Sequence, residues 1–186
     1  MCIRDSFDSD NGVIVCGYAK SNDTNESSRI YSTSNGGESW DIVGSGPATN
    51  IIKGVVYVSS DVGFFCYDYV EGMDSNLYKT DDGGKTFAKV MLEEQELDSS
   101  AANPQGQETE TKTDSGKNGA DSSEQLRWGD VYKEALTPVV DSTGIITIYL
   151  TQGKNAVYND GKTAAKYQSS DKGSTWKYIG QVEIKD

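Results

Sequence analysis

The side chains that could carry out chemistry are restricted in this 186-residue chain, because it contains no histidine. Histidine general bases, histidine-activated nucleophiles and histidine metal ligands are therefore excluded together. Catalysis would have to use carboxylates, tyrosines or cysteine, and no recognisable carboxylate motif marks a glycosidase site. The cysteines are Cys2, Cys16 and Cys66, and the last two lie in apolar runs. We expect Cys16 and Cys66 to be small buried side chains, with neither a disulfide framework nor a zinc site.

Three ten-residue segments repeat along the chain without gaps. Each begins with a tyrosine and ends nine positions later with an aromatic residue. Each has Asn or Asp five positions before that aromatic, glycine three before it and Ser or Thr one before it. The segments are Tyr31–Trp40, Tyr78–Phe87 and Tyr167–Trp176. A glycine that opens an apolar stretch precedes each segment, so the repeat is longer than the segment itself.

The residue types in this segment predict a self-contained β-hairpin turn. An Asn or Asp side chain can accept hydrogen bonds from backbone amides one or two residues further on. Glycine supplies the positive φ that a tight turn requires. The final Trp or Phe can pack back over the turn, which contributes about 2–3 kcal/mol of burial. We assign this structural role to Asn35, Gly37, Trp40, Asp82, Gly84, Phe87, Asp171, Gly173 and Trp176.

These segments resemble the Asp-box, or BNR repeat, with the pattern Ser/Thr-x-Asp-x-Gly-x-Thr-Trp. The match is strong at 169–176, good at 80–87, where Phe87 replaces Trp, and weaker at 33–40, where Asn35 replaces Asp. The family includes sialidases, other glycoside-acting propellers, sortilin-type receptors and secreted bacterial proteins. The resemblance implies an all-β fold, a β-propeller of four-stranded antiparallel blades. In it the box joins the third and fourth strands of a blade.

The same resemblance implies where a ligand would bind. Turns alternate between the two faces of such a blade, and Asp-box sialidases have their active site on the face opposite the boxes. The candidate ligand-contacting residues on that face are Arg29, Tyr69, Glu71, Arg127 and Tyr158. Tyr69 and Glu71 could act as a pair, although a tyrosine beside a surface glutamate is more often structural. Tyr158 is the only aromatic residue in its loop, and an exposed tyrosine can form a platform for a sugar or peptide.

Two functions remain open from the sequence. Sialidases resembling this fold use three arginines on the substrate carboxylate, a tyrosine nucleophile activated by glutamate, an aspartate acid/base and an Arg-Ile-Pro motif. This chain has only Arg4, Arg29 and Arg127, and its nearest motif is Arg29-Ile30-Tyr31. One arginine cannot hold a carboxylate from several sides. The sequence therefore favours a non-catalytic binding or scaffolding module, and the alternative is a fragment of a sialidase-like glycoside hydrolase.

The spacing of the repeats predicts about three blades and one long insertion. Residues 93–126 contain nine acidic residues, two lysines and no aromatic residue, valine or isoleucine. Such a segment cannot bury enough apolar surface to offset the entropy lost on ordering. We expect blades one and two in residues 1–92, a disordered acidic insertion at 93–126, and blade three with the start of a further strand in 127–186.

The ends of the chain suggest an incomplete propeller. Blade one has no plausible first strand in the sequence, and blade three has only a weak one near Leu136–Val140. Residues 181–185 alternate as a strand that no other segment is expected to pair with. Complete propellers have about 4–8 blades, so the remaining blades of a longer chain are expected as partners.

Charge and composition limit the other partners. There are 17 Lys and Arg residues against 29 Asp and Glu, a net charge of -12. Such a surface repels phosphate backbones, so no nucleic-acid partner is expected. No apolar run approaches the roughly 20 residues of a membrane span, and residues 1–6 are not a signal peptide. The family resemblance implies an extracytoplasmic or secreted protein with a carbohydrate or protein ligand, and no cofactor or metal is expected.

Overall fold

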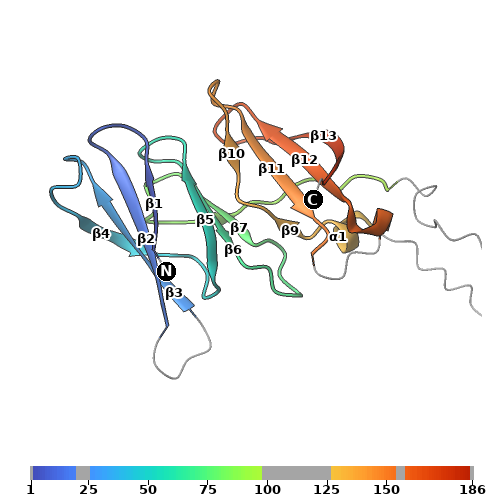
Figure 1. Ribbon diagram of the computed structural model, residues 1–186, viewed down its shortest axis with the longest axis horizontal. Coiled ribbons are helices and arrows are strands. Elements are labelled where there is room, and N and C mark those ends of the chain that lie inside the picture. The colour runs from blue at the N-terminus through green and yellow to red at the C-terminus, as the bar shows by residue number, and fades with distance from the viewer. Residues whose placement is uncertain (1, 20–25, 98–126, 154–157, 185–186) are drawn as a thin grey trace, which may run out of the picture.

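The computed structural model describes residues 2–19, 26–97, 127–153 and 158–184. Its strands form three antiparallel sheets that follow one another in chain order and stand side by side (Figure 1). We call these sheets blades one, two and three. Helix within the described residues is limited to α1 (Trp128–Val131) and a short 3₁₀ segment, η2 (Tyr158–Gly161). Neither is long enough to cross a membrane.

Each blade is built from strands in sequential order. Blade one contains β1 (Cys2–Ser6), β2 (Gly12–Ala19), β3 (Glu26–Thr33) and β4 (Asp41–Ser45). Blade two contains β5 (Ile52–Tyr57), β6 (Gly63–Tyr67), β7 (Leu77–Thr80) and β8 (Ala88–Lys89). Blade three contains β9 (Glu134–Ala135), β10 (Val139–Val140), β11 (Ile146–Thr151), β12 (Thr163–Ser169) and β13 (Lys177–Glu183), and both β9 and β10 pair with β11. Because β9 and β10 pair with successive parts of β11, they together take the place of a first strand, and the prediction of three antiparallel blades with four strand positions is confirmed.

The first strand of blade one exists, contrary to the sequence-based expectation. β1 is short and polar, which gave it no apolar signature, yet it pairs with β2 along its whole length. In that register Cys2 lies directly opposite Cys16, and the two form a disulfide. The expectation that Cys16 is a buried reduced side chain is therefore wrong. Cys66 is buried as expected, and burial raises the pKa of its thiol to about 11.

The tail of the chain is not a separate strand. β13 continues through residues 181–183, which pair with residues 163–165 of β12. A register shift between Lys166 and Tyr167 lets the strand run on, and Gly180 lies opposite Lys166 with φ 142°. The expectation of an unpartnered strand at 181–185 is wrong for residues 181–183, because this bulge keeps the same outer strand in the sheet.

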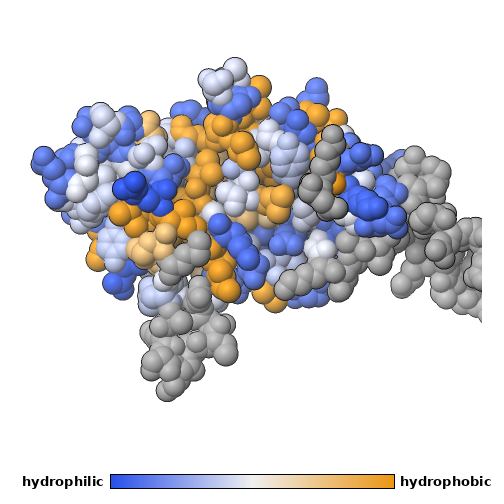
Figure 2. All heavy atoms as spheres, in the orientation of Figure 1, coloured by the Kyte–Doolittle hydropathy of each residue, from blue (hydrophilic) through white to orange (hydrophobic). Residues whose placement is uncertain are grey.

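Blade two forms the centre of the core because both of its faces are covered. Successive side chains of a strand point to opposite faces, and all five residues of β6 are buried. Phe65 and Tyr67 pack in a cluster with Val13, Val15 and Ile30 of blade one. Phe64 and Cys66 pack in a second cluster with residues of blade three. Figure 2 shows the apolar residues gathered over blade two and its two junctions.

A third cluster packs α1 onto blade three. It contains Trp128, Val131 and Tyr132 of the α1 segment and Tyr167 of β12. The first residues of the predicted acidic insertion take part in it: Leu97 packs against the cluster, and the Tyr167 hydroxyl donates a hydrogen bond of 2.6 Å to the Glu93 carbonyl. The rest of the segment predicted to be disordered, from residue 98 to 126, lies outside the described residues.

Candidate ligand-binding cleft

The third repeat turn, at residues 169–176, is organised around the Asp171 carboxylate. Its Oδ1 accepts hydrogen bonds from the Ser169 hydroxyl (2.7 Å) and the Thr175 amide (2.9 Å). Its Oδ2 accepts one from the Thr175 hydroxyl (2.6 Å). The Gly173 amide donates to Ser169 Oγ (2.8 Å), which closes the turn. Hydrogen bonds to the charged form stabilise it, so the Thr175 hydroxyl above all holds the pKa of Asp171 well below its usual range.

The other two repeat turns use the same arrangement. Asp82 Oδ1 accepts from the Thr86 amide (2.8 Å) and its Oδ2 from the Thr86 hydroxyl (2.6 Å), and the pKa of Asp82 is lowered for the same reason. In the first turn Asn35 Oδ1 accepts from the Ser39 amide (3.0 Å), and Asn35 Nδ2 donates to Ser39 Oγ (2.9 Å). The neutral amide of Asn35 therefore makes the hydrogen bonds to residue 39 that a carboxylate makes in the other two turns.

The repeat turns share one edge of the molecule with the first turn of each blade. The Gly36 amide donates to the Asp10 carbonyl, and the Gly83 amide donates to the Asp61 carbonyl, each at 2.8 Å. The first turns are themselves capped by a side chain that accepts backbone amides, a pattern that the sequence analysis missed. These capping residues are Asp8, Ser59 and Asp141. The backbone amides of these turns are therefore engaged in hydrogen bonds within or between the turns.

A cleft of about 370 Å³ opens at the opposite end of the strands, between blades two and three. The β6–β7 loop and the segment that follows β8 form one wall, and α1 with the residues leading into and ending β9 forms the other. Its polar lining consists of Tyr69, Asp74, Ser75, Asn76, Glu94, Arg127, Asp130, Tyr132 and Lys133. Both the β6–β7 loop and the connection between the blades contribute, as expected for this face.

Three ion pairs fix the charged side chains around the cleft. They join Lys89 to Asp74 (2.6 Å), Lys133 to Glu71 (3.0 Å) and Arg127 to Asp130 (3.0 Å). Exposed pairs of this kind add little stability, but they orient the carboxylates. Hydrogen bonds from Lys89 and Arg127 lower the pKa values of Asp74 and Asp130, so both carboxylates are ionised at neutral pH.

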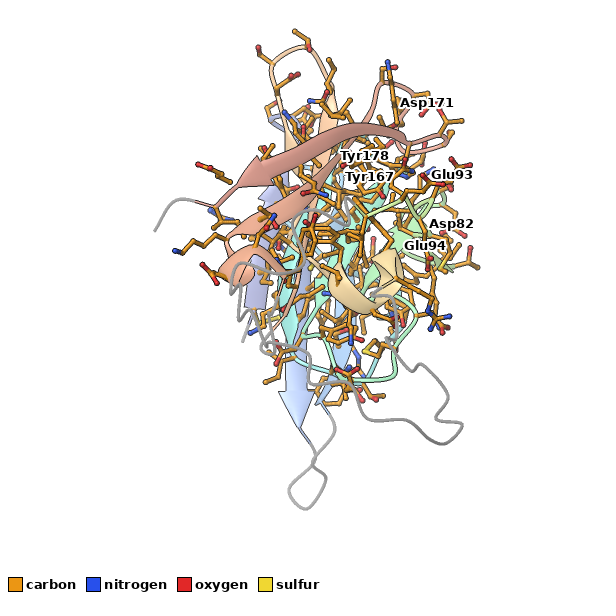
Figure 3. All side chains as sticks on the ribbon, turned by 90° about the vertical axis from the view of Figure 1, so that its right-hand side faces the viewer. Asp82, Glu93, Glu94, Tyr167, Asp171 and Tyr178 are labelled. Carbon is orange, nitrogen blue, oxygen red and sulfur yellow. A yellow bond between two sulfur atoms is a disulfide. The ribbon has the colours of Figure 1, made fainter. Side chains whose placement is uncertain are left out.

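Aromatic rings support the wall that α1 forms. Trp128 and Tyr132 are only 4% and 3% exposed, and their ring centroids lie 4.7 Å apart. Tyr167 and Tyr178 lie side by side on β12 and β13, with centroids 5.4 Å apart (Figure 3). Glu94 lies against α1, where a methyl group on Gly129 would be 2.5 Å from its Oε1 (Figure 3). A rigid aromatic layer therefore holds the polar lining in place.

Comparison with solved structures decides the fold. The chain is similar to an oligogalacturonate lyase in complex with manganese, with 9% identity, a TM-score of 0.51, and coverage of 93% of this chain and 39% of that chain. It is also similar to the GH74 enzyme of Niastella koreensis, with 16% identity, a TM-score of 0.44, and coverage of 90% of this chain and 19% of that chain. The oligogalacturonate lyase is a β-propeller protein, and the three antiparallel sheets of this chain follow one another as propeller blades do. The chain has a β-propeller fold.

The chain spans well under half the length of either solved structure. At these identities the similarity shows the propeller fold alone. No protein-family model matches the chain, and no curated protein matches it.

The propeller brings three of the five predicted ligand-contacting residues together. Tyr69 and Arg127 line the cleft, and Glu71 reaches its rim through the ion pair with Lys133. Tyr69 and Glu71 are thus close to one site, on the face opposite the repeat turns. The pairing of Glu71 with Lys133 gives Glu71 a structural role at the rim.

The other two predicted residues lie elsewhere. Tyr158 is 1% exposed, and its ring packs against Tyr132 with centroids 6.2 Å apart. It cannot be a ligand platform, because the 3₁₀ segment turns its ring into the third cluster. Arg29 lies on β3 of blade one, with its guanidinium carbon 5.7 Å from the centroid of the Tyr18 ring. It takes no part in the cleft.

Sequence reasoning missed most of the cleft. The segment from Trp128 to Lys133 supplies much of its lining, and its signal was the sudden appearance of aromatic residues after the polar segment 93–126. Asp74 and Glu94 gave no local signal, because isolated acidic residues are common on surfaces. No group of His, Cys, Asp or Glu that could hold a metal ion occurs in the part of the chain that the structure describes.

Proposed function

We propose that this chain is part of an Asp-box β-propeller that binds a carbohydrate, without catalysis, in the cleft between blades two and three. The observation that carries the proposal is the lining of that cleft: Asp74, Glu94 and Asp130 lie around one cavity together with the half-buried Tyr69. Carboxylate oxygens are strong acceptors for sugar hydroxyls. Tyrosine offers a hydroxyl group and an apolar ring face.

The protonation states favour binding over hydrolysis. Glycosidases of the usual type need one carboxylic acid with a raised pKa to protonate the leaving group. In this cleft Lys89 and Arg127 lower the pKa values of Asp74 and Asp130 instead. Both groups therefore serve as hydrogen-bond acceptors, and neither suits the role of general acid.

The positions of the arginines argue against the sialidase alternative. Arg127 lies at the cleft, Arg29 lies on blade one, and Arg4 lines a separate hollow beside the first repeat turn. Three arginines this dispersed cannot clamp one carboxylate. The Asp-box assignment itself is supported by the shared geometry around Asn35, Asp82 and Asp171.

We also propose that the protein works outside the cytoplasm. The support is the disulfide between Cys2 and Cys16, since disulfides persist mainly in oxidising compartments.

The test is a binding screen of the full chain against an array of neutral and acidic oligosaccharides, followed by titration calorimetry of the best ligand. We expect Asp130→Asn and Tyr69→Ala to weaken binding about tenfold each, the loss of roughly one good hydrogen bond or ring contact. Asp61→Asn, on the opposite face, is the matched control and should bind normally. The chain should release no reducing ends from the bound sugar and no sialic acid from a fluorogenic sialoside. The absence of any glycan ligand, or equal binding by all three variants, would refute the assignment.

A further inference from the structure

The cationic side chains that line the cleft already have carboxylate partners. Arg127 and Lys133 are both in the lining. Arg127 pairs with Asp130, and Lys133 pairs with Glu71, each at 3.0 Å. A carboxylate on a bound sugar would have to compete with these partners for either cation. The cleft is therefore poorly suited to an acidic sugar.

The carboxylates of the lining are not all matched in this way. Asp74 pairs with Lys89, at 2.6 Å. Asp130 pairs with Arg127. Glu94 makes no ion pair and no hydrogen bond with any residue that the structure describes. The lining therefore contains one carboxylate whose charge no neighbouring cation offsets.

The packing of α1 holds Glu94 at the wall of the cleft. A methyl group on Gly129 would lie 2.5 Å from Glu94 Oε1 and 3.2 Å from its Cδ. The absence of a side chain at Gly129 thus leaves the space that the carboxylate occupies against α1 (Figure 3). Because Gly129 itself lines the cleft, this position keeps the Glu94 carboxylate beside the cavity.

The segment around Glu94 is also negative. Glu93 and Glu96 belong to the same segment and are exposed, and the whole chain has a net charge of -12. A surface of one sign attracts ligands of the opposite charge and repels those of like charge. Anionic sugars are therefore disfavoured at this wall, and cationic sugars are favoured.

From this balance of charges we infer that the carbohydrate bound in the cleft is an amino sugar, whose protonated amino group donates hydrogen bonds to the Glu94 carboxylate. The inference rests on the proposed function and names its substrate class. An ammonium group offers three donors and no acceptor, so it suits a carboxylate that has no other partner. A hydroxyl or an acetamide group at the same position brings no charge to this contact.

The test compares three trisaccharides that differ only in the group at C2 of each ring. They are cellotriose (hydroxyl), chitotriose (free amine) and N-acetylated chitotriose (acetamide). By titration calorimetry at low salt and mildly acidic pH, we expect chitotriose to bind about fivefold more tightly than either of the others. That preference should shrink as salt is added, because salt screens a pair that lies near the surface.

Two variants separate a specific contact from general attraction to an acidic protein. Glu94→Gln removes the charge, and Gly129→Ala keeps the charge but displaces the carboxylate from α1, in a helix where alanine is favourable. Each should lower the ratio of chitotriose to cellotriose affinity towards one. Glu96→Gln removes an equal charge outside the lining and is the matched control, which should keep the ratio.

The outcomes distinguish this inference from the proposed function. Equal affinities for the three trisaccharides, or a preference that survives in Glu94→Gln or Gly129→Ala, would overturn the inference and leave the carbohydrate site in place. The same conclusion would follow if a glycan without an amino group bound and none of the three trisaccharides did. If no glycan bound at all, the proposed function would fail together with the inference.

Discussion

Single carboxylates order the repeat turns, and their ionisation determines how the turns respond to acid. Asp82 and Asp171 each accept hydrogen bonds from one threonine through both oxygens, and both have a pKa below the ordinary value. A depressed folded-state pKa contributes stability above the unfolded pKa, which is about 4 for aspartate, and loses it as the pH falls. The turns should therefore weaken below about pH 4.

Asp82→Asn combined with Asp171→Asn should reduce this acid sensitivity. Asn35 shows that an amide can hold the same turn, through the Ser39 amide and hydroxyl. We expect the double variant to fold, to have a lower urea midpoint than the unmodified chain at pH 6, and to lose less stability between pH 6 and pH 3. Urea titrations at both values measure this. Asp61→Asn, whose side chain makes no hydrogen bond among the described residues, should keep the full pH dependence. An unchanged drop in the double variant would contradict the role of these carboxylates.

At the scale of elements, the hairpin turns also form the joints between blades. Gly173 adopts φ 75° and lies against Phe64, so it meets a backbone requirement and a packing requirement together. Gly144, which precedes β11, adopts φ 82° but has no neighbour within 4 Å of the position of an added methyl group. A substitution at Gly144 therefore tests backbone strain alone, and the same substitution at Gly173 tests backbone strain together with close packing.

Gly173→Ala should cost clearly more stability than Gly144→Ala. Both substitutions force alanine into a left-handed conformation, which costs about 1–2 kcal/mol. At Gly173 the added methyl group also displaces Phe64, and overpacking costs a further 1–3 kcal/mol or so. Urea unfolding of the two variants gives the difference directly. Equal losses would mean that the repeat turn of blade three does not pack tightly on blade two.

At the scale of the whole molecule, buried polar groups join blades that are distant in sequence. Asn76, at the start of β7, is 1% exposed. Its side-chain amide donates to the carbonyls of Tyr67 (2.8 Å) and Ala135 (2.9 Å), and its Oδ1 accepts from the Ala135 amide (2.8 Å). The side chain thus acts as a strand-like partner for β9 and ties blade two to blade three.

Asn76→Ala should therefore destabilise the molecule by about 3 kcal/mol or more, because it leaves several buried backbone groups without partners. Asn50→Ala is the matched control: its amide makes only weak contacts, a long one to the Asp68 carbonyl at 3.5 Å and one to the thioether Met73 Sδ at 3.3 Å. That variant should change stability by less than about 1 kcal/mol. Urea unfolding followed by tryptophan fluorescence measures both. A loss at Asn76 no larger than that at Asn50 would show that this amide does not join the blades.

The repeat turns and the strands around them could be predicted because their interactions are local. The side-chain hydrogen bonds within each turn join residues no more than four positions apart, as from Thr175 to Asp171, so a short motif is enough to form the turn. The β6 strand was equally predictable, since a run of apolar residues is what burial on both faces requires. With three such units in order, the sequence by itself determined the all-β architecture, whereas the ligand-binding face stays a prediction that comes from the Asp-box resemblance.

Only the tertiary structure decided the rest, because it depends on contacts between segments far apart in the chain. The cleft exists where the β6–β7 loop meets α1, more than fifty residues later. The Cys2–Cys16 disulfide follows from the pairing register of a strand with no apolar signature. Tyr158 became a core residue because Tyr132, brought in by α1, covers its ring. No local pattern encodes these contacts, since each is set by how one blade packs against the next.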